Sequence, residues 1–443
     1  MYKDKKILIL GAARSGIAAA KVLAKDNKVI LTDIKEISLE EETLLYDLGV
    51  EFIVCDNQDS LLDDSFDYVV KNPGIKPSHP VIDKCRELGI PVINEMEVAY
   101  SYIHEDQFII GVTGSNGKTT TVTLIDKLLR SLDIDVVVGG NIGTPLCELI
   151  DEISTDKVLL LEISDHQLMN LNKFKTNISL LTNIFVSHLD YHGTFDSYKN
   201  SKKKIFNNLT SEDVSFINKK NSDSMDLLKD IKSNVKYFND ELNYVTDEGI
   251  YIDGKLVYKA SDIKLVGLHN YENILSATLV SLELYEDKEY AIDKFREVIK
   301  EFNGVEHRIE FVRELNGVCY YNDSKATSPT GTKIALNTFK KPIHLILGGQ
   351  EQSQDFYSLK NNMNNITKIY AIGENALRVC EYAKDMGIDV IVCNTLSNAV
   401  KSVYENASSG DVVLLSPASA SFDQFKKFED RGTLFKELVN KLK

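Results

Sequence analysis

An α/β protein of three domains is the fold that this sequence predicts, on three observations. The chain has 443 residues, which is too many for a single hydrophobic core. At roughly 150 residues per domain, this length suggests about three domains. Short apolar runs typical of strands alternate with helical patterns along most of its length, as in parallel sheets covered by helices. Such a series opens at three places, KKILILGAARSG, QFIIGVTGSNGKTT and EHRIEFV.

These three series set the predicted domain boundaries. Residues 1–94 are expected to form a Rossmann-like domain that ends after the run PVIN. Residues 95–304 are expected to hold a parallel-rich sheet of the P-loop ATPase type, with the strands VLLLEIS and ISLLTNI and a helix around HNYENILSATLVSLEL. Residues 305–443 carry HLILGG, KIYAIG, VIVC and VVLLSPAS, which are spaced for a second Rossmann-like sheet.

The composition is that of a folded globular protein, with 43% hydrophobic and 26% charged residues. A formal net charge of -15 opposes binding to nucleic acid or to an anionic membrane. The one basic run, Lys202 to Lys204, is typical of a solvated helix face. We therefore expect small-molecule substrates, no nucleic-acid or membrane partner, and a monomer, since no pattern signals a dimer.

The cysteines and the first residues bear on the compartment. Six cysteines are spread along the chain without a C-x-x-C pair, so neither a zinc site nor a disulfide framework is predicted. The start MYKDKKILIL passes from charged residues directly into a short strand pattern, without a signal-peptide core or a membrane-length apolar stretch. A cytoplasmic location is the prediction.

The run GVTGSNGKTT predicts a phosphate-binding loop between a strand and a helix. Backbone N–H groups of Gly114, Ser115, Asn116 and Gly117 and the following helix N-terminus would converge on an anion. Lys118 would bind the outer phosphates, and the Thr119 hydroxyl would help to hold Mg²⁺. The spacing departs from a strict Walker A motif, because Val112 stands where the first Gly is required.

Two polar groups are expected at the same edge of the central sheet. Glu162 ends the strand VLLLE, a position where a carboxylate can hold the Mg²⁺ of a nucleotide. The next strand leads into VSHLDYHG, which brings His188, Asp190 and His192 to that edge. Without other information, a lone histidine in such a loop is better explained by a hydrogen bond than by a metal ligand.

Taken together, these runs resemble the Mur ligases of peptidoglycan synthesis, which share a fold with the folylpolyglutamate synthases. The similar segments extend along the whole chain and include TGSNGKTT, GNIG, NIFVSHLDYHG, LHNYENILSA, EHRIE and NDSKAT. The resemblance implies an ATP-dependent ligase that forms an amide bond through an acyl phosphate. Its C-terminal run SPASASFDQFKKFEDRGTLF is similar to that of the members that add D-glutamate to a UDP-linked muramoyl-alanine acceptor.

The resemblance also assigns roles to residues. It implies a carbamoylated lysine within YKNSKKKI, which selects Lys202, and a carbamate there would bridge to a second Mg²⁺ beside His188. The implied catalytic residues are Lys118, Glu162, His188, Lys202, Arg308 and Lys325. The implied ATP-binding residues are Gly114 to Thr119, Thr120, Asn270, Asn273, Arg308 and Asp323, and the implied metal ligands are Thr119, Glu162, His188 and Lys202.

The N-terminal turn GAARSG resembles a dinucleotide-binding turn, but Ala13 replaces the second Gly and would hinder the approach of a pyrophosphate. A dehydrogenase is therefore not favoured. By resemblance, this domain binds the UDP part of the acceptor. The implied acceptor-binding residues are Arg14, Ser15, Gly16, Asp33, Asn72, Gly74, Asn141, Ser164 and Gln167, and the implied amino-acid-binding residues are Thr327, Gln352, Ser421 and Phe428.

Three departures from the family pattern keep alternatives open. The family commonly has Ser-Ser-Phe-Gln after the strand Glu, whereas Asp165 and His166 stand at the middle positions here. Gln352 replaces a Lys or Arg that pairs with a carboxylate of D-glutamate, and Ser187 precedes His188 where an acidic or amide residue is frequent. A related ligase with another amino-acid substrate, or a catalytically silent nucleotide-binding relative, are the alternative hypotheses.

Overall fold

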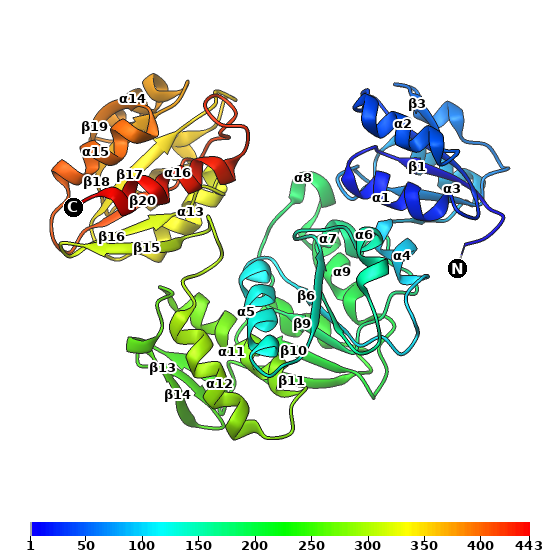
Figure 1. The fold of residues 1–443 in the computed structure, drawn as a ribbon, viewed down its shortest axis with the longest axis horizontal. Helices are drawn as coiled ribbons and strands as arrows, with labels where there is room; N and C mark the ends of the chain where they lie inside the picture. Colours follow the sequence, from blue (N-terminus) through cyan, green and yellow to red (C-terminus); the bar gives the residue numbers. More distant parts are fainter. Residues whose placement is uncertain (1) are drawn as a thin grey trace. The chain divides into compact units, whose positions relative to one another are not determined.

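The computed structural model describes residues 2–443, which form two compact units. One unit extends to Val257 and includes Glu272–Val298, and the other comprises Tyr258–Tyr271 and Ile299–Lys443. The large sheet or sheets of each unit are mainly parallel, with helices packed on them (Figure 1). No helix within residues 2–443 combines the length and the apolar character needed to cross a bilayer.

The first unit begins with a five-stranded parallel sheet in the order β3-β2-β1-β4-β5. Alternate residues of β1 face opposite ways: Ile7 and Ile9 pack with α1, while Leu8 and Leu10 pack with α3. The strands are β1 (Lys6–Leu10), β2 (Lys28–Asp33), β3 (Glu51–Val54), β4 (Tyr68–Lys71) and β5 (Val92–Ile93), and the helices are α1 (Arg14–Leu23), α2 (Leu39–Asp47), α3 (Pro80–Leu88) and α4 (Glu95–Tyr100).

Helix α4 joins this sheet to the next one and is almost wholly buried. Asn94 caps it by accepting a hydrogen bond from the backbone N–H of Glu97 at 3.1 Å. The Glu97 carboxylate in turn accepts from the backbone N–H groups of Asn172, Lys173 and Phe174 at 2.7–3.2 Å. The domain boundary expected near Asn94 therefore lies in a packed segment inside the first unit. The division of this unit into two domains at that residue stays a prediction.

A six-stranded parallel sheet follows, in the order β11-β10-β9-β6-β8-β7. Strands β6, β8 and β9 at its centre are buried along their full length, which explains their continuous apolar sequences. The strands are β6 (Ile109–Thr113), β7 (Val136–Gly140), β8 (Val158–Glu162), β9 (Ile178–Leu181), β10 (Val214–Asn218) and β11 (Asn234–Phe238). The helices are α5 (Lys118–Arg130), α6 (Leu146–Leu149), α7 (Asp165–Leu168), α8 (Leu189–His192), α9 (Phe195–Lys203) and α10 (Ser222–Met225).

A small three-stranded sheet and two helices connect the two units in sequence. The strands are β12 (Tyr244–Thr246), β13 (Gly249–Ile252) and β14 (Lys255–Lys259), and the helices are α11 (Leu268–Leu282) and α12 (Lys288–Glu301). Helix α11 confirms the helix predicted around HNYENILSATLVSLEL.

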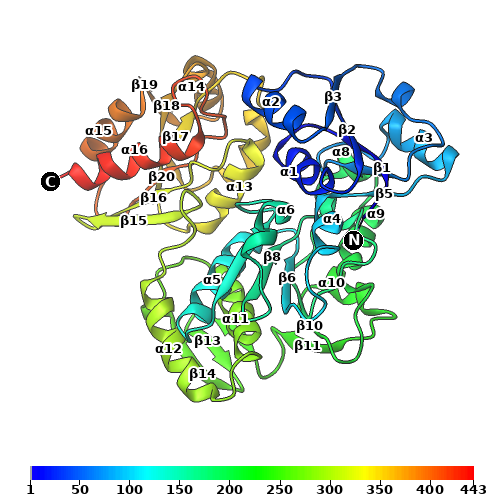
Figure 2. The ribbon, with the colours of Figure 1, turned by 45° about the vertical axis from the view of Figure 1, so that its right-hand side comes forward.

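The second unit holds a six-stranded sheet in the order β15-β16-β20-β17-β18-β19, in which only β15 is antiparallel to its neighbour. Helices α13 and α14 pack on one face and α15 and α16 on the other (Figure 2). The strands are β15 (Glu310–Leu315), β16 (Val318–Asn322), β17 (Ile343–Gly348), β18 (Ile366–Ile372), β19 (Asp389–Asn394) and β20 (Val412–Leu415), and the helices are α13 (Pro329–Thr338), α14 (Ala376–Asp385), α15 (Leu396–Asn406) and α16 (Phe428–Lys441). The predicted α/β class and the parallel strands of all three sections are confirmed.

Candidate active site

The loop between β6 and α5 has the geometry of a phosphate cradle. Gly114 and Gly117 adopt positive φ angles of 148° and 84°. A Cβ on Gly114 would lie 1.9 Å from Thr182 Oγ1, and a Cβ on Gly117 would lie 2.2 Å from Asn273 Oδ1. Only glycine satisfies both the backbone angles and these close approaches.

Neighbouring segments hold this loop in place. The backbone N–H of Asn116 donates to Asn183 Oδ1 at 2.9 Å, and Thr182 Oγ1 donates to the Asn116 carbonyl at 2.7 Å. Lys118 Nζ donates to the carbonyls of Gly114 and Ser115 at 2.8 and 3.1 Å. The loop is thus formed before any anion binds, with the lysine folded back over it.

Glu162 connects the phosphate loop to the turn GNIG. It is buried at the carboxyl end of β8, where Oε2 accepts from Thr119 Oγ1 and Oε1 accepts from Asn141 Nδ2, both at 2.8 Å. Two oxygen ligands beside a phosphate cradle are the donors that Mg²⁺ prefers. The expected metal ligands Thr119 and Glu162 are therefore adjacent, and Thr120 is buried one residue further along α5.

A second group of charged side chains lies behind the loop around Lys202. The Lys202 side chain is fully buried, and its Nζ lies 3.1 Å from Thr113 Oγ1 and 3.4 Å from Asp165 Oδ1. Burial lowers the pKa of Lys202 to about 7, with a further contribution from the Lys118 charge, and Asp165 offsets part of this shift. The residue predicted from composition as part of a solvated face is therefore a core lysine, because α9 turns it inward.

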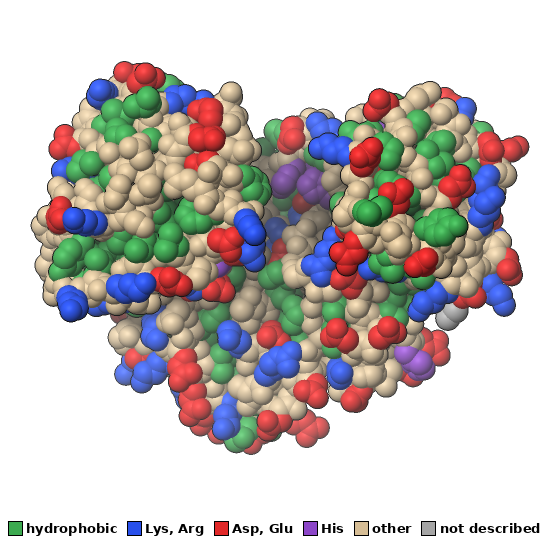
Figure 3. Space-filling model, turned by 45° about the horizontal axis from the view of Figure 1, so that its top comes forward, with side chains coloured by type: hydrophobic (Ala, Val, Ile, Leu, Met, Phe, Trp, Pro, Cys, Tyr) green, Lys and Arg blue, Asp and Glu red, His purple; other side chains and the backbone are tan. Residues whose placement is uncertain are grey.

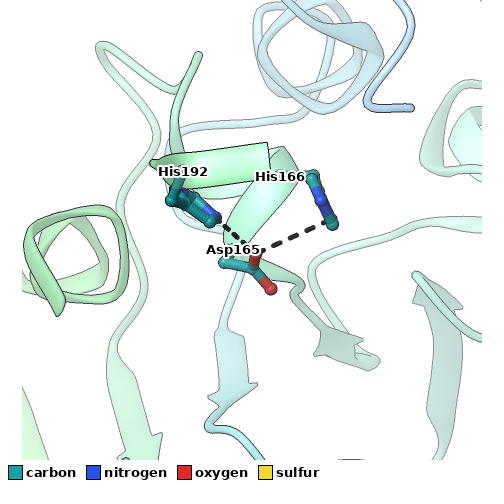
Figure 4. A group of neighbouring side chains, drawn as sticks. All are labelled: Asp165, His166 and His192. Atoms are coloured by element: carbon teal, nitrogen blue, oxygen red, sulfur yellow. Dashed lines mark hydrogen bonds and ion pairs between the residues drawn. The ribbon is translucent and has the colours of Figure 1, made fainter. Parts of the chain in front are cut away.

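The histidines of the loop after β9 surround this group. His188 is exposed at a positive φ of 51°, and its ring centroid lies 5.0 Å from that of His166. His192 Nε2 lies 2.7 Å from Asp165 Oδ2 (Figure 4). Burial opposes ionisation of Asp165, but the charge of Lys202 and the hydrogen bond with His192 outweigh it and hold its pKa well below the usual range. Burial lowers the pKa of His166 to about 4, despite the nearby Asp165.

Sequence reasoning noted Asp165 and His166 only as departures from a pattern and did not group them with His192. The three come from separate places, the start of α7 and the end of α8, and meet only in the folded chain. One signal was present, since all three follow the carboxyl ends of β8 and β9, the two parallel strands that flank β6.

The residues expected to bind the acceptor occupy two places in the first unit. Asp33 and Asn72 line a cavity of about 550 Å³ beside the turn that begins at Gly11. The Asp33 carboxylate accepts from the backbone N–H of Ala12 at 2.7 Å, and Asn72 Nδ2 donates to Ser15 Oγ at 3.1 Å. Asn72 Oδ1 also accepts from the backbone N–H of Gly74 at 3.2 Å.

The other expected acceptor residues lie on the larger sheet or face it. Arg14 forms an ion pair with Glu148 at 2.7 Å and donates to the Gly143 carbonyl at 2.9 Å, so it contacts the GNIG turn. Ser164 and Gln167 bond to each other as a capping box at the start of α7. Gly16 packs so closely on the Gly11 carbonyl that a Cβ would lie 1.9 Å from its oxygen.

In the second unit, Asp323 lies at the end of β16 and is bonded to Ser416 at the end of β20. Burial raises the pKa of Asp323 to about 7, while a hydrogen bond from Ser416 Oγ at 2.7 Å and the charge of Arg308 act against the shift. Lys325 and Thr327 are exposed in the following turn, and Asn270 donates to the Val266 carbonyl at 2.8 Å.

Arg431 is a residue of this unit that sequence reasoning missed. It is 1% exposed and donates to Ser324 Oγ and to the carbonyls of Ser324, Ser419 and Ala420 at 2.9–3.3 Å. It therefore ties the run NDSKAT to the run SPASAS, beside the buried Ser421. The Phe428 carbonyl accepts from Ser324 Oγ at 2.8 Å. Gln352 lies apart on an exposed loop, where its Nε2 donates to Gln350 Oε1 at 2.9 Å.

A parallel sheet with a preformed phosphate cradle and oxygen ligands for Mg²⁺ defines a nucleotide-phosphate-binding α/β protein. Residues 112–281 match the Mur ligase middle domain, and residues 307–419 match the glutamate ligase domain of Mur ligases. The chain belongs to the Mur ligase family, whose members are ATP-dependent ligases of peptidoglycan precursor synthesis.

Two relatives are similar along their whole length. The UDP-N-acetylmuramoylalanine--D-glutamate ligase of Geobacillus kaustophilus (strain HTA426) is 40% identical over 451 residues, covering 100% of this chain and 99% of that protein. The ligase of the same name from Bacillus mycoides (strain KBAB4) is also 40% identical over 451 residues, covering 100% and 98%. The UDP-N-acetylmuramate-alanine ligase MurC of Thermotoga maritima shares the fold, with a TM-score of 0.58, 19% identity and coverage of 98% and 99%.

Proposed function

We propose that the chain joins D-glutamate to UDP-N-acetylmuramoyl-L-alanine at the expense of ATP. The observation that carries this proposal is 40% identity, over all of this chain, to ligases whose names state that D-glutamate addition. The geometry of the phosphate cradle supports it, because Lys118 lies over the loop and Thr119 contacts Glu162. We further propose a monomer in the cytoplasm.

The proposed reaction has two steps. A carboxylate oxygen of the acceptor attacks the γ-phosphorus of ATP, and the bond from that phosphorus to the β,γ-bridging oxygen breaks. ADP is released, and the acceptor carboxylate becomes an acyl phosphate. The D-glutamate amine then attacks the acyl carbon, loses a proton and expels phosphate, which leaves an amide. No side-chain nucleophile is needed, so the protein contributes positioning and charge through Lys118 and, in the second unit, Arg308 and Lys325.

Two Mg²⁺ ions and a carbamoylated Lys202 belong to this proposal. The oxygens of Thr119 and Glu162 suit one Mg²⁺, and His188 with a modified Lys202 would hold the other. Lys202 suits the modification because CO₂ adds to a neutral amine, and burial lowers the pKa of this lysine to about 7. When bound, the ions offset the charge of the transferring phosphoryl group.

Acceptor and amino acid would bind at separate places. The cavity at Asp33 and Asn72 is proposed for the UDP part, and Thr327, Gln352, Ser421 and Phe428 are proposed for D-glutamate. On the face drawn in Figure 3, Lys and Arg side chains are interspersed with Asp and Glu, which supports small-molecule substrates rather than nucleic acid.

The test is phosphate release by the purified protein with ATP, Mg²⁺ and UDP-N-acetylmuramoyl-L-alanine, across a panel of D- and L-amino acids. We expect phosphate release only when the amino acid is D-glutamate. Release with a different amino acid would replace D-glutamate as the substrate, and no release with any of them would support a silent relative.

Gln352 gives this test a matched variant. A neutral amide binds a carboxylate more weakly than a lysine does, by about 1 kcal/mol. Q352K should therefore lower the KM for D-glutamate about fivefold with little change in kcat, whereas N361K, at an exposed position further along the chain, should not. An unchanged KM in Q352K would remove Gln352 from the proposed amino-acid site.

A further inference from the structure

The side chains of Asp165, His166 and His192 converge in the first unit (Figure 4). One ligand atom from each lies within 4.8 Å of the others. None of the three has a part in the reaction proposed above. We propose that Asp165, His166 and His192 form a binding site for a divalent transition-metal ion, of the class of Zn²⁺, Co²⁺ or Mn²⁺.

The fold fixes the two buried members before any ion binds. Asp165 opens α7 directly after its capping residue, so its backbone is held by the capping box of Ser164 and Gln167. The side chains of Asp165 and His192 are 5% and 0% exposed. His192 Nε2 lies 2.7 Å and His166 Nδ1 lies 3.7 Å from the same atom, Asp165 Oδ2. Both imidazoles therefore face one carboxylate oxygen.

The donor set selects the class of ion. Two imidazole nitrogens and one carboxylate oxygen are typical ligands of Zn²⁺ and of other first-row ions, whereas Mg²⁺ prefers oxygen alone. The other ring nitrogen of His192, Nδ1, is buried and has no hydrogen-bond partner among residues 2–443. Ligation through Nε2 therefore breaks no bond of this ring except the one to Asp165.

The neighbouring lysine is compatible with this site. Lys202 contacts the other carboxylate oxygen, Oδ1, at 3.4 Å. One carboxylate can thus contact the unmodified Lys202 through Oδ1 and an ion through Oδ2. The set also differs from Thr119, Glu162, His188 and Lys202, and its Asp165 and His166 stand where the family commonly has Ser and Phe.

The test uses the full chain without nucleotide or substrate, after removal of metals with a chelator. Co²⁺ is titrated in excess Mg²⁺, so that oxygen-only sites are filled, and visible absorption and equilibrium dialysis report its ligation and stoichiometry. We expect one Co²⁺ per chain with a nitrogen-ligand absorption band. This readout needs no ligase activity, so failure of the proposed function leaves it interpretable.

Three variants make the assignment specific. H166F keeps the ion pair of Asp165 with Lys202 and should weaken Co²⁺ binding about tenfold or more, because loss of even an orienting partner costs roughly 10- to 100-fold. D165S/H166F restores the family residues and should abolish the band. H104F/D106S removes an exposed His–Asp pair elsewhere in the unit and should bind as the parent does. No band in the parent, or an unchanged affinity in H166F, would overturn the proposal.

Discussion

The phosphate loop and the cluster around Lys202 lie at the same edge of one sheet and are built in opposite ways. The loop consists of backbone groups from one short segment, and its lysine donates to the loop's own carbonyls. The cluster consists of side chains from α7, α8 and α9, and its lysine is buried against a carboxylate. The loop holds Lys118 where it is proposed to meet the phosphates of a ligand, whereas the cluster holds Lys202 in the core beside Asp165.

The largest effect is expected when the loop loses its charge. K118A should reduce kcat/KM for phosphate release about 1000-fold, because no other side chain of the loop offers a cation to the outer phosphates. K127A, at an exposed position of the same helix, is the control and should keep the parent rate. A kcat/KM for K118A within tenfold of the parent value would show that the loop lysine does not contribute the charge proposed for it.

Glu162 contacts the phosphate loop at Thr119, and loss of its charge should cost less. E162Q retains a side chain that can bond to Thr119 and Asn141 but loses the negative charge, so kcat/KM should fall about 100-fold and recover in part at high Mg²⁺. The exposed E152Q serves as the reference. If the kcat/KM of E162Q is the same at all Mg²⁺ concentrations, Glu162 orients the loop and does not hold the ion.

The core lysine should be visible in the pH dependence of stability. Its pKa is about 7 in the folded chain and 10.5 as the ordinary value, so the unfolded chain holds more protons between these pH values. The free energy of unfolding should therefore rise with pH in this window, by up to ~1.4 kcal/mol per pH unit, relative to K202M. Urea titrations at pH 7 and pH 9 in a chelating buffer measure this. A constant difference between the two proteins would mean that Lys202 stays charged throughout.

The smallest effect concerns the support of the loop. N183A removes the side-chain contacts to both backbone groups of Asn116, so the loop should be less well formed and the KM for ATP should rise about fivefold. N207A, at an exposed position after α9, should leave the KM unchanged. An unaltered KM in N183A would show that the glycines and Thr182 alone hold the loop.

The same contrast explains what the sequence could predict. The position of the loop between a strand and a helix was predicted correctly because strand, glycines, lysine and helix are contiguous, and the glycines are required by local backbone angles. Its phosphate binding stays a prediction. The inward position of Lys202 followed only from resemblance, and composition alone gave the opposite prediction. Asp165, His166 and His192 were not grouped, and Arg431 was overlooked within a run that had been quoted, because their roles depend on contacts between distant segments.

Helix α4 has a consequence for protein engineering. Its residues Glu95 to Ala99 are buried, and the carboxylate of Glu97 binds three consecutive backbone N–H groups of the segment after α7. A cut after residue 94 would separate Asn94 from α4 and so remove the cap that Asn94 provides at the backbone N–H of Glu97. A chimera that exchanges the acceptor domain between relatives should therefore take its crossover before Asn94, so that α4 and its cap travel with the central sheet.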